Sequence, residues 1–311
     1  MRNQPVARAV PTPGTGTLSV FALVWLLAML SSARQALGGA PDGNPLTVTR
    51  AALELPQVIS ASLIAGIAVG LVAGNLLVRF APAAADRPAA RYAVGAAAGV
   101  VTGLLVATPI LLGYAGLPSI LALSGTVAGA AALGGLLSGV RHRSVVAAGA
   151  AGALGVFAVG LLERAFEGDL RHLFGAGESA QSVVTATGWV VLTASLVAGA
   201  AAGGLGFAYL RRCDPAGRRW PAYLVAGATP GVLVLLAEAV TRLGGARLFH
   251  AVSTASADDQ AVLSYFHAAR FNRALIVIFV GALVATFLLG RTLRPADPDP
   301  SATEEPAQAS S

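Results

Sequence analysis

Charged residues are scarce in this sequence, and lysine is absent altogether. Only 12% of the 311 residues are charged, whereas soluble domains have about 25%. With 55% of its residues hydrophobic, the chain has too few polar groups to cover a surface exposed to water, which excludes a soluble globular protein. The hydrophobic content also excludes an intrinsically disordered chain, apart from the two polar ends. The composition therefore predicts an integral membrane protein that crosses the bilayer many times.

Several motifs of catalysis and ligand binding are also missing. The single cysteine, Cys213, excludes an intramolecular disulfide, and no Cys/His spacing predicts a structural metal site. The sequence has no P-loop, no His-Glu-x-x-His, no Gly-x-Ser-x-Gly and no dinucleotide fingerprint. We therefore expect no cofactor, no metal and no ATPase activity in this chain. All 21 basic residues are arginine, and in a membrane protein these set the orientation of the helices, so we expect no nucleic-acid partner.

Stretches without charge predict the membrane spans, because a charged side chain in mid-bilayer costs several kcal/mol. About 20 apolar residues in a helix cross the hydrocarbon core. The window 92–140 is too long for one helix, and the turn signal Gly113–Pro118 divides it. The prediction is an all-α polytopic fold with eight transmembrane helices. They are expected near 17–37, 57–79, 92–114, 118–140, 144–163, 184–210, 221–241 and 273–290.

The arginines predict the orientation of these helices. If the N-terminus is cytoplasmic, the inside segments hold 13 of the 21 arginines and 6 of the 15 acidic residues, a net charge of +7. The outside segments hold the other 8 arginines and 9 acidic residues, a net charge of −1. This distribution follows the positive-inside rule. We therefore expect a plasma-membrane protein with both termini in the cytoplasm, a cytoplasmic segment 1–16 and a disordered tail 295–311.

Segments of the first half recur in the second half. Ala61–Gly66 matches Ala194–Gly199 at an offset of 133 residues, and Gly95–Val100 aligns with Gly227–Val232. Arginine-rich loops fall in corresponding places. We interpret this pattern as a 4+4 duplication, with parallel repeats related by an axis along the membrane normal. The two repeats span 17–143 and 144–294.

An alternative interpretation takes the N-terminus as a cleaved signal peptide. Arg2 and Arg8 would form its basic region, Leu18–Leu30 its apolar region and Gly38–Ala40 its cleavage site. The duplication argues against cleavage, because it gives the first helix a counterpart in the second half.

Four of the predicted helices carry glycines four residues apart, on one face of each helix. Helices in lipid associate through close contacts between small residues. We expect the helices 57–79, 92–114, 184–210 and 221–241 to form one tight central cluster. Their glycines are Gly66, Gly70, Gly74, Gly95, Gly99, Gly103, Gly199, Gly203, Gly227 and Gly231.

Two outside segments have an amphipathic pattern. In 163–174, Glu167 and Arg171 are spaced for an i,i+4 ion pair. The segment 256–272 lies within a predicted long outer loop, 242–272. We expect both segments to be short helices that lie flat in the outer membrane interface.

Glu238 is the acidic residue that lies well within a predicted span. An ionisable residue in a transmembrane helix is by default a candidate functional site, but Arg242 at i+4 also offers it a purely structural ion pair. Thr229-Pro230-Gly231 interrupts the same helix. Proline removes a backbone hydrogen bond, so unwound backbone could line a cavity, or the helix could merely kink. We take Glu238, Thr229, Pro230 and Gly231 as a candidate translocation or binding path.

Two classes of function remain open. A transporter or permease-type subunit without its own ATPase agrees with the duplication and with Glu238. A non-catalytic scaffold or accessory subunit of an envelope or secretion system agrees with the small number of polar residues in the spans. An intramembrane enzyme is less favoured, because no acid–base pair or nucleophile is recognisable. Besides the lipid bilayer, the expected partner is a separate subunit (an ATPase or an envelope component) or a second copy of this chain.

Overall fold

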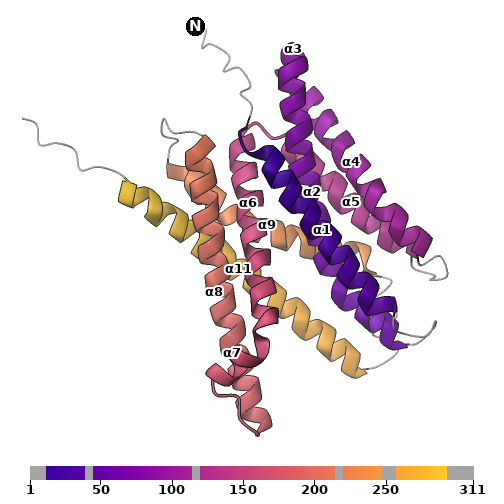
Figure 1. The fold of residues 1–311 in the computed structure, drawn as a ribbon, viewed down its shortest axis with the longest axis vertical. Coiled ribbons are helices and arrows are strands. Elements are labelled where there is room, and N and C mark those ends of the chain that lie inside the picture. Colours follow the sequence, from indigo (N-terminus) through magenta and orange to yellow (C-terminus); the bar gives the residue numbers. More distant parts are fainter. Residues whose placement is uncertain (1–11, 39–44, 114–119, 214–219, 247–256, 293–311) are drawn as a thin grey trace, which may run out of the picture.

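The computed structural model describes residues 12–38, 45–113, 120–213, 220–246 and 257–292. Within these residues it has eight helices that are long and apolar enough to cross a membrane, which confirms the predicted all-α fold (Figure 1). The eight helices are α1 (Thr15–Gly38), α2 (Pro45–Phe80), α4 (Pro88–Gly113), α5 (Ile120–Ser138), α6 (Arg143–Ala165), α8 (Ala180–Cys213), α9 (Trp220–Gly244) and α11 (Ala257–Thr292). Two short helices, α3 (Pro82–Ala85) and α7 (Glu167–Leu173), lie between them.

The last helix differs from the prediction. Helix α11 begins at Ala257 and runs for 36 residues to Thr292 without a break. The segment 256–272 was expected to be a separate helix lying flat in the interface, and this is wrong, because its residues from Ala257 onward are the first part of the spanning helix. Ser256 itself lies outside the described residues. The other amphipathic segment does form a short helix, α7, in which Arg171 and Glu167 make the predicted ion pair.

The first helix is packed into the bundle. Leu18, Ala22 and Leu26 of α1 are buried, and α1 packs against α2 and α6. The Trp25 ring stacks on Phe157 of α6, with ring centroids 5.2 Å apart.

Polar contacts hold the residues just before α1. The Asn75 side chain of α2 accepts a hydrogen bond from the backbone nitrogen of Thr12 and donates to its carbonyl oxygen, at 3.1 and 2.8 Å. The same side chain donates to the Thr15 hydroxyl at 2.9 Å. The Tyr209 hydroxyl of α8 donates to the carbonyl oxygen of Pro13 at 2.8 Å. The start of the described chain is therefore bonded to both α2 and α8.

The long helices form two groups that contact each other (Figure 1). In the first group, α2 packs against α1, α4 and α5. In the second group, α8 packs against α6, α9 and α11. The two groups meet where α2 contacts α6 and α9 and where α5 contacts α9.

The glycine-bearing faces pack against helices other than those predicted. The predicted glycines of α2 and α4 face α5, apart from Gly74, and the predicted glycines of α8 and α9, Gly199, Gly203, Gly227 and Gly231, face α11. A Cβ atom on Gly103 would lie 2.6 Å from the carbonyl oxygen of Ala128, and one on Gly203 would lie 2.5 Å from that of Gly281. The predicted single cluster of α2, α4, α8 and α9 is wrong, because α5 and α11 each collect the glycines of their own group. Glycine spacing identifies the packing face of a helix but not the helix that covers it.

The glycine contacts follow the same order in both groups. Gly70 faces Gly135 and Ser138 of α5, and the equivalent Gly203 faces Gly281 and Val284 of α11. Gly95 likewise faces Gly135, as Gly227 faces Gly281. All these partners on α5 and α11 are related by one offset of 146 residues. The geometry agrees with the 4+4 duplication, which stays a prediction.

Candidate functional site

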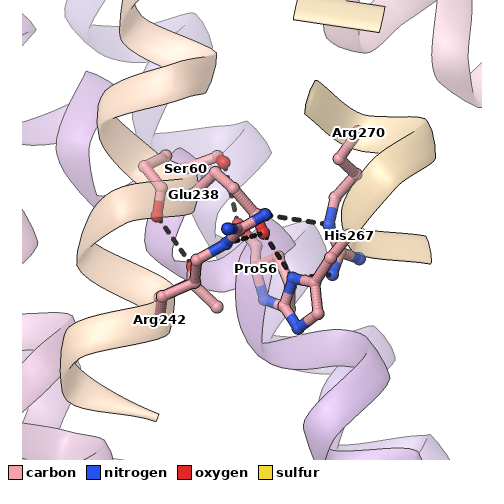
Figure 2. Close-up of polar contacts among 8 residues, drawn as sticks. Pro56, Ser60, Glu238, Arg242, His267 and Arg270 are labelled. Atoms are coloured by element: carbon pink, nitrogen blue, oxygen red, sulfur yellow. Dashed lines mark hydrogen bonds and ion pairs between the residues drawn. The ribbon is translucent and has the colours of Figure 1, made fainter. Parts of the chain in front are cut away.

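Glu238 lies on the face of α9 that packs against α11, and only 6% of its side chain is exposed. The Nε atom of Arg242, one turn later on α9, donates to Oε1 of Glu238 at 3.1 Å. The Nε atom of Arg270 on α11 donates to Oε2 at 3.0 Å. The Nδ1 atom of His267, also on α11, contacts Oε1. We call these four residues the Glu238 cluster; Figure 2 shows them converging on the carboxylate from α9 and α11.

Sequence reasoning found only one partner of this carboxylate. The i,i+4 spacing predicted the contact with Arg242, and that contact forms. Arg270 and His267 lie 32 and 29 residues away along the chain, so local spacing could not reveal them. The available signal was the three-residue spacing of His267, Arg270 and Arg273, which puts three basic groups on one side of a helix that then continues into the membrane.

The partners of Glu238 differ in their exposure to solvent. The side chain of Arg242 is 53% exposed, whereas those of Arg270 and His267 are 24% and 17% exposed. Arg270 is therefore the enclosed counter-charge, and Arg242 covers the carboxylate from the outside. The Nη2 atom of Arg270 also lies 3.3 Å from Nδ1 of His267, so the two α11 side chains support each other.

A second ion pair lies on the same helix. The Nη1 atom of Arg273 on α11 donates to Oε2 of Glu163 on α6 at 2.8 Å. Their side chains are 23% and 17% exposed. Each of these two arginines of α11 is thus paired with a carboxylate from an earlier helix, Arg270 with α9 and Arg273 with α6.

An open hollow of about 580 Å³ adjoins the Glu238 cluster. Arg242 and His267 belong to both the cluster and the lining of this hollow. The rest of the lining is Ser264, Ala268, Phe271 and Asn272. Helix α2 of the first group packs against α9, and Figure 2 shows its residues Pro56 and Ser60 beside the cluster. The Ser60 hydroxyl donates to the carbonyl oxygen of Pro56 at 2.8 Å.

The segment Thr229-Pro230-Gly231 is helical. Helix α9 continues through it, so the unwound backbone considered from the sequence does not occur. The Thr229 hydroxyl donates to the carbonyl oxygen of Val225 at 2.6 Å. A Cβ atom on Gly231 would lie 2.6 Å from the carbonyl oxygen of Ala274 on α11. These residues pack against neighbouring helices and do not line the hollow next to Glu238; their part in a translocation path stays a prediction.

Comparisons with protein-family models, with curated proteins and with solved structures found no match. The eight apolar helices show only the general class of protein to which the chain belongs. It is a multi-pass membrane protein. In such a protein, the chemistry available at the Glu238 cluster is ionic. A carboxylate is held by two guanidinium groups and by one imidazole.

Proposed function

We propose that this protein is a transporter or permease-type membrane subunit without its own ATPase, and that the hollow beside α11 is where its solute meets the Glu238 cluster. The observation that supports this proposal is a carboxylate, Glu238, that is buried within a membrane span and whose partners Arg242 and His267 line an open hollow. Ionisable residues within spans mark substrate, ion or proton pathways in membrane proteins.

Packing alone does not account for this cluster. Helices α9 and α11 already have a close contact through Gly227, Gly231 and Gly281. Burying charged groups costs several kcal/mol per ion before their mutual attraction is counted, and apolar residues at such a place are often as stable. A cluster that is retained despite this cost therefore favours a function beyond holding the two helices together.

The exposures of the arginines suggest how the cluster works. Because Arg242 is half-exposed and faces the hollow, it can leave Glu238 for an anionic group of a solute while Arg270 still neutralises the carboxylate. The cluster can thus exchange one partner for a solute without leaving a bare charge in the membrane.

The wider arrangement agrees with this proposal. Parallel repeats related by an axis along the membrane normal occur in transporters, although the Glu238 cluster itself lies within the second repeat, between α9 and α11. The 4+4 duplication, with repeats 17–143 and 144–294, is supported by the matching glycine contacts of α5 and α11. We also propose a plasma-membrane location with both termini in the cytoplasm, on the strength of the arginine distribution. The Glu238 cluster is then near the outer face.

Glu238→Gln tests the proposal, with Glu163→Gln as the matched control. Both substitutions remove one carboxylate that pairs with an arginine of α11, but only Glu238 belongs to the cluster at the hollow. The purified proteins are reconstituted in proteoliposomes and challenged with amino acids, organic acids, sugars and inorganic ions. Flux is followed by charge movement on a supported membrane and by an internal pH dye.

We expect the wild type to move at least one of these solutes. Glu238→Gln should lower that flux about tenfold or more, whereas Glu163→Gln should keep most of it. Equal effects of the two substitutions would show that Glu238 acts only as an ion-pair partner. A wild-type protein that moves no solute in either assay would overturn the transport proposal.

A scaffold or accessory subunit is the second candidate, favoured by one observation. Helix α11 has 36 residues, more than the roughly 20 that a span requires, and Tyr265 and Phe266 near its start are 61% and 41% exposed. Exposed aromatic side chains of this kind can anchor a partner subunit. A Tyr265→Ser, Phe266→Ser double variant should then lose an envelope partner that crosslinks to the wild type, while the flux assay shows no change.

A further inference from the structure

A buried arginine, Arg143, and a partly buried one, Arg91, lie at the end of the bundle away from Glu238. Arg143 is the first residue of α6, and Arg91 lies in the first turn of α4. On α2, the residue that contacts Arg143 is Gly74. Ser60, beside the Glu238 cluster, is 14 residues earlier on this helix, which corresponds to about 21 Å. This second region therefore shares no residue with the proposed solute hollow.

Arg143 is enclosed, and two of its three guanidinium nitrogens have no partner among the residues that the structure describes. Its side chain is 8% exposed. Within the described chain, its Nε and Nη1 atoms are buried and have no hydrogen-bond partner. Its guanidinium group lies against the α2 backbone at Gly74, where an added Cβ atom would collide with it. A glycine in α2 is therefore what leaves room for this charged group between the helices.

Other unpartnered polar atoms accompany Arg143. In the same described residues, the Nε atom of Arg91 and the Oγ atom of Ser144 are buried without a hydrogen-bond partner. The start of α4 lies beside the turn that leads into α6, since a Cβ atom on Gly139 would lie 2.9 Å from the Cα atom of Tyr92, the neighbour of Arg91. Each unsatisfied buried donor costs about 1–3 kcal/mol, and more when it is charged. The arrangement is therefore unfavourable unless a hydrogen-bond acceptor lies between these groups, and an anion would also offset their positive charge.

The start of α6 adds to the attraction for an anion. This 23-residue helix begins at Arg143, and its N-cap residue, His142, makes no side-chain hydrogen bond to the first turn. The N-terminus of a helix carries a partial positive charge and free backbone N–H groups, which favour phosphate and carboxylate. Two guanidinium groups, a hydroxyl and a helix N-terminus then point to an anion with several oxygen atoms.

We propose that Arg91, Arg143 and Ser144 bind a phosphate group at the N-terminus of α6. Guanidinium groups suit phosphate because they donate two parallel hydrogen bonds. Two sources share this chemistry, namely the headgroup of an anionic phospholipid and free inorganic phosphate. Arg79, Arg87 and Arg141 lie at the same end of the bundle in sequence terms, and basic pockets between transmembrane helices on the cytoplasmic side typically hold lipid headgroups.

Thermal unfolding of the purified full chain tests this proposal. The protein in neutral detergent is titrated with dioleoylphosphatidylglycerol, dioleoylphosphatidylcholine or inorganic phosphate. The variants are Arg143→Gln, Gly74→Ala and the control Arg141→Gln, which removes an exposed arginine two residues away. Gly74→Ala keeps both arginines but displaces the Arg143 guanidinium group, and so probes the site without removing a charge.

For the wild type, we expect phosphatidylglycerol to raise the unfolding temperature more than phosphatidylcholine does. Arg143→Gln and Gly74→Ala should weaken the apparent affinity for the anion about tenfold or more, and Arg141→Gln should keep it. A response to phosphatidylglycerol alone assigns a lipid, and an equal response to inorganic phosphate assigns a soluble anion; both support the site. The proposal is overturned if neither anion stabilises the wild type, or if Arg141→Gln weakens binding as much as Arg143→Gln.

Discussion

The contact of Gly135 on α5 with α4 predicts a large response to one added methyl group. A Cβ atom on Gly135 would lie 2.8 Å from both the backbone nitrogen and the Cα atom of Gly99. Real Cβ atoms do not approach other atoms this closely. Because the neighbouring atoms are helix backbone, they cannot rotate away as a side chain could, and α4 and α5 must move apart.

The same helix supplies a matched control for Gly135→Ala. Gly129 is six residues earlier on α5, and a Cβ atom there would have nothing within 4 Å. Both substitutions gain up to about 1 kcal/mol in helix propensity. Only Gly135→Ala adds the cost of overpacking, about 1–3 kcal/mol. The free energy of unfolding of Gly135→Ala should therefore be about 1–3 kcal/mol lower than that of Gly129→Ala.

Titration with sodium dodecyl sulfate in mixed micelles measures this difference, with helix content followed by circular dichroism. The comparison of two alanine variants cancels the propensity gain that they share. Free energies within about 0.5 kcal/mol of each other, the range of ordinary surface substitutions, would refute the reasoning. The close approach of α4 and α5 would then not contribute to stability.

Two further predictions concern polar contacts. Arg270→Gln should lower the free energy of unfolding by about 1.5–3 kcal/mol, and Arg242→Gln should lower it by at most about 1 kcal/mol. The reason is that Arg270 is 24% exposed and Arg242 is 53% exposed. Equal losses in the same titration would contradict this ranking. Asn75→Ala should speed amide hydrogen exchange at Thr12 about tenfold or more, because it removes the hydrogen bond to the Thr12 nitrogen. Leu76→Ala, at an exposed neighbouring position, is its control and should leave that exchange rate unchanged.

The positions of the spans could be predicted from the sequence because a membrane penalises charge so strongly. Helix α4 was expected at 92–114 and is found at Pro88–Gly113, and α9 was expected at 221–241 and is found at Trp220–Gly244. Charge-free windows and turn residues sufficed, since each is a local property of the chain. Fold class follows from such local properties when the solvent is lipid.

The prediction of α11 did not succeed, for a physical reason. The expected start of the span at residue 273 came from a stretch without charge that begins directly after Arg273. Glu238 and Glu163 neutralise the last two arginines before this stretch, so the helix keeps them and continues. A search for charge-free stretches cannot detect an ion pair between residues more than 30 positions apart. Such a search therefore ends a span too early wherever the charges of the span are neutralised by other helices.

In the candidate site too, local features of the sequence could be recognised and contacts between distant residues could not. Glu238 was recognisable because it is an isolated carboxylate in an apolar segment, and Arg242 because it is one turn away. His267 and Arg270 were not recognisable, because only the packing of α9 against α11 brings them to Glu238.

The pairing of Arg270 and Arg273 also constrains how the chain is made. An unpaired arginine costs about 2.5–3.5 kcal/mol at the centre of an inserting helix and less towards the interface. The carboxylate partners of Arg270 and Arg273 lie on α9 and α6, which leave the ribosome before α11. We therefore expect α6 and α9 to be close to α11 when it inserts, so that its basic side chains can pair with Glu163 and Glu238. The ion pairs thus favour a chain in which α6 and α9 are synthesised before α11. A circularly permuted chain that begins with α11 should insert poorly, even though its final contacts would be unchanged.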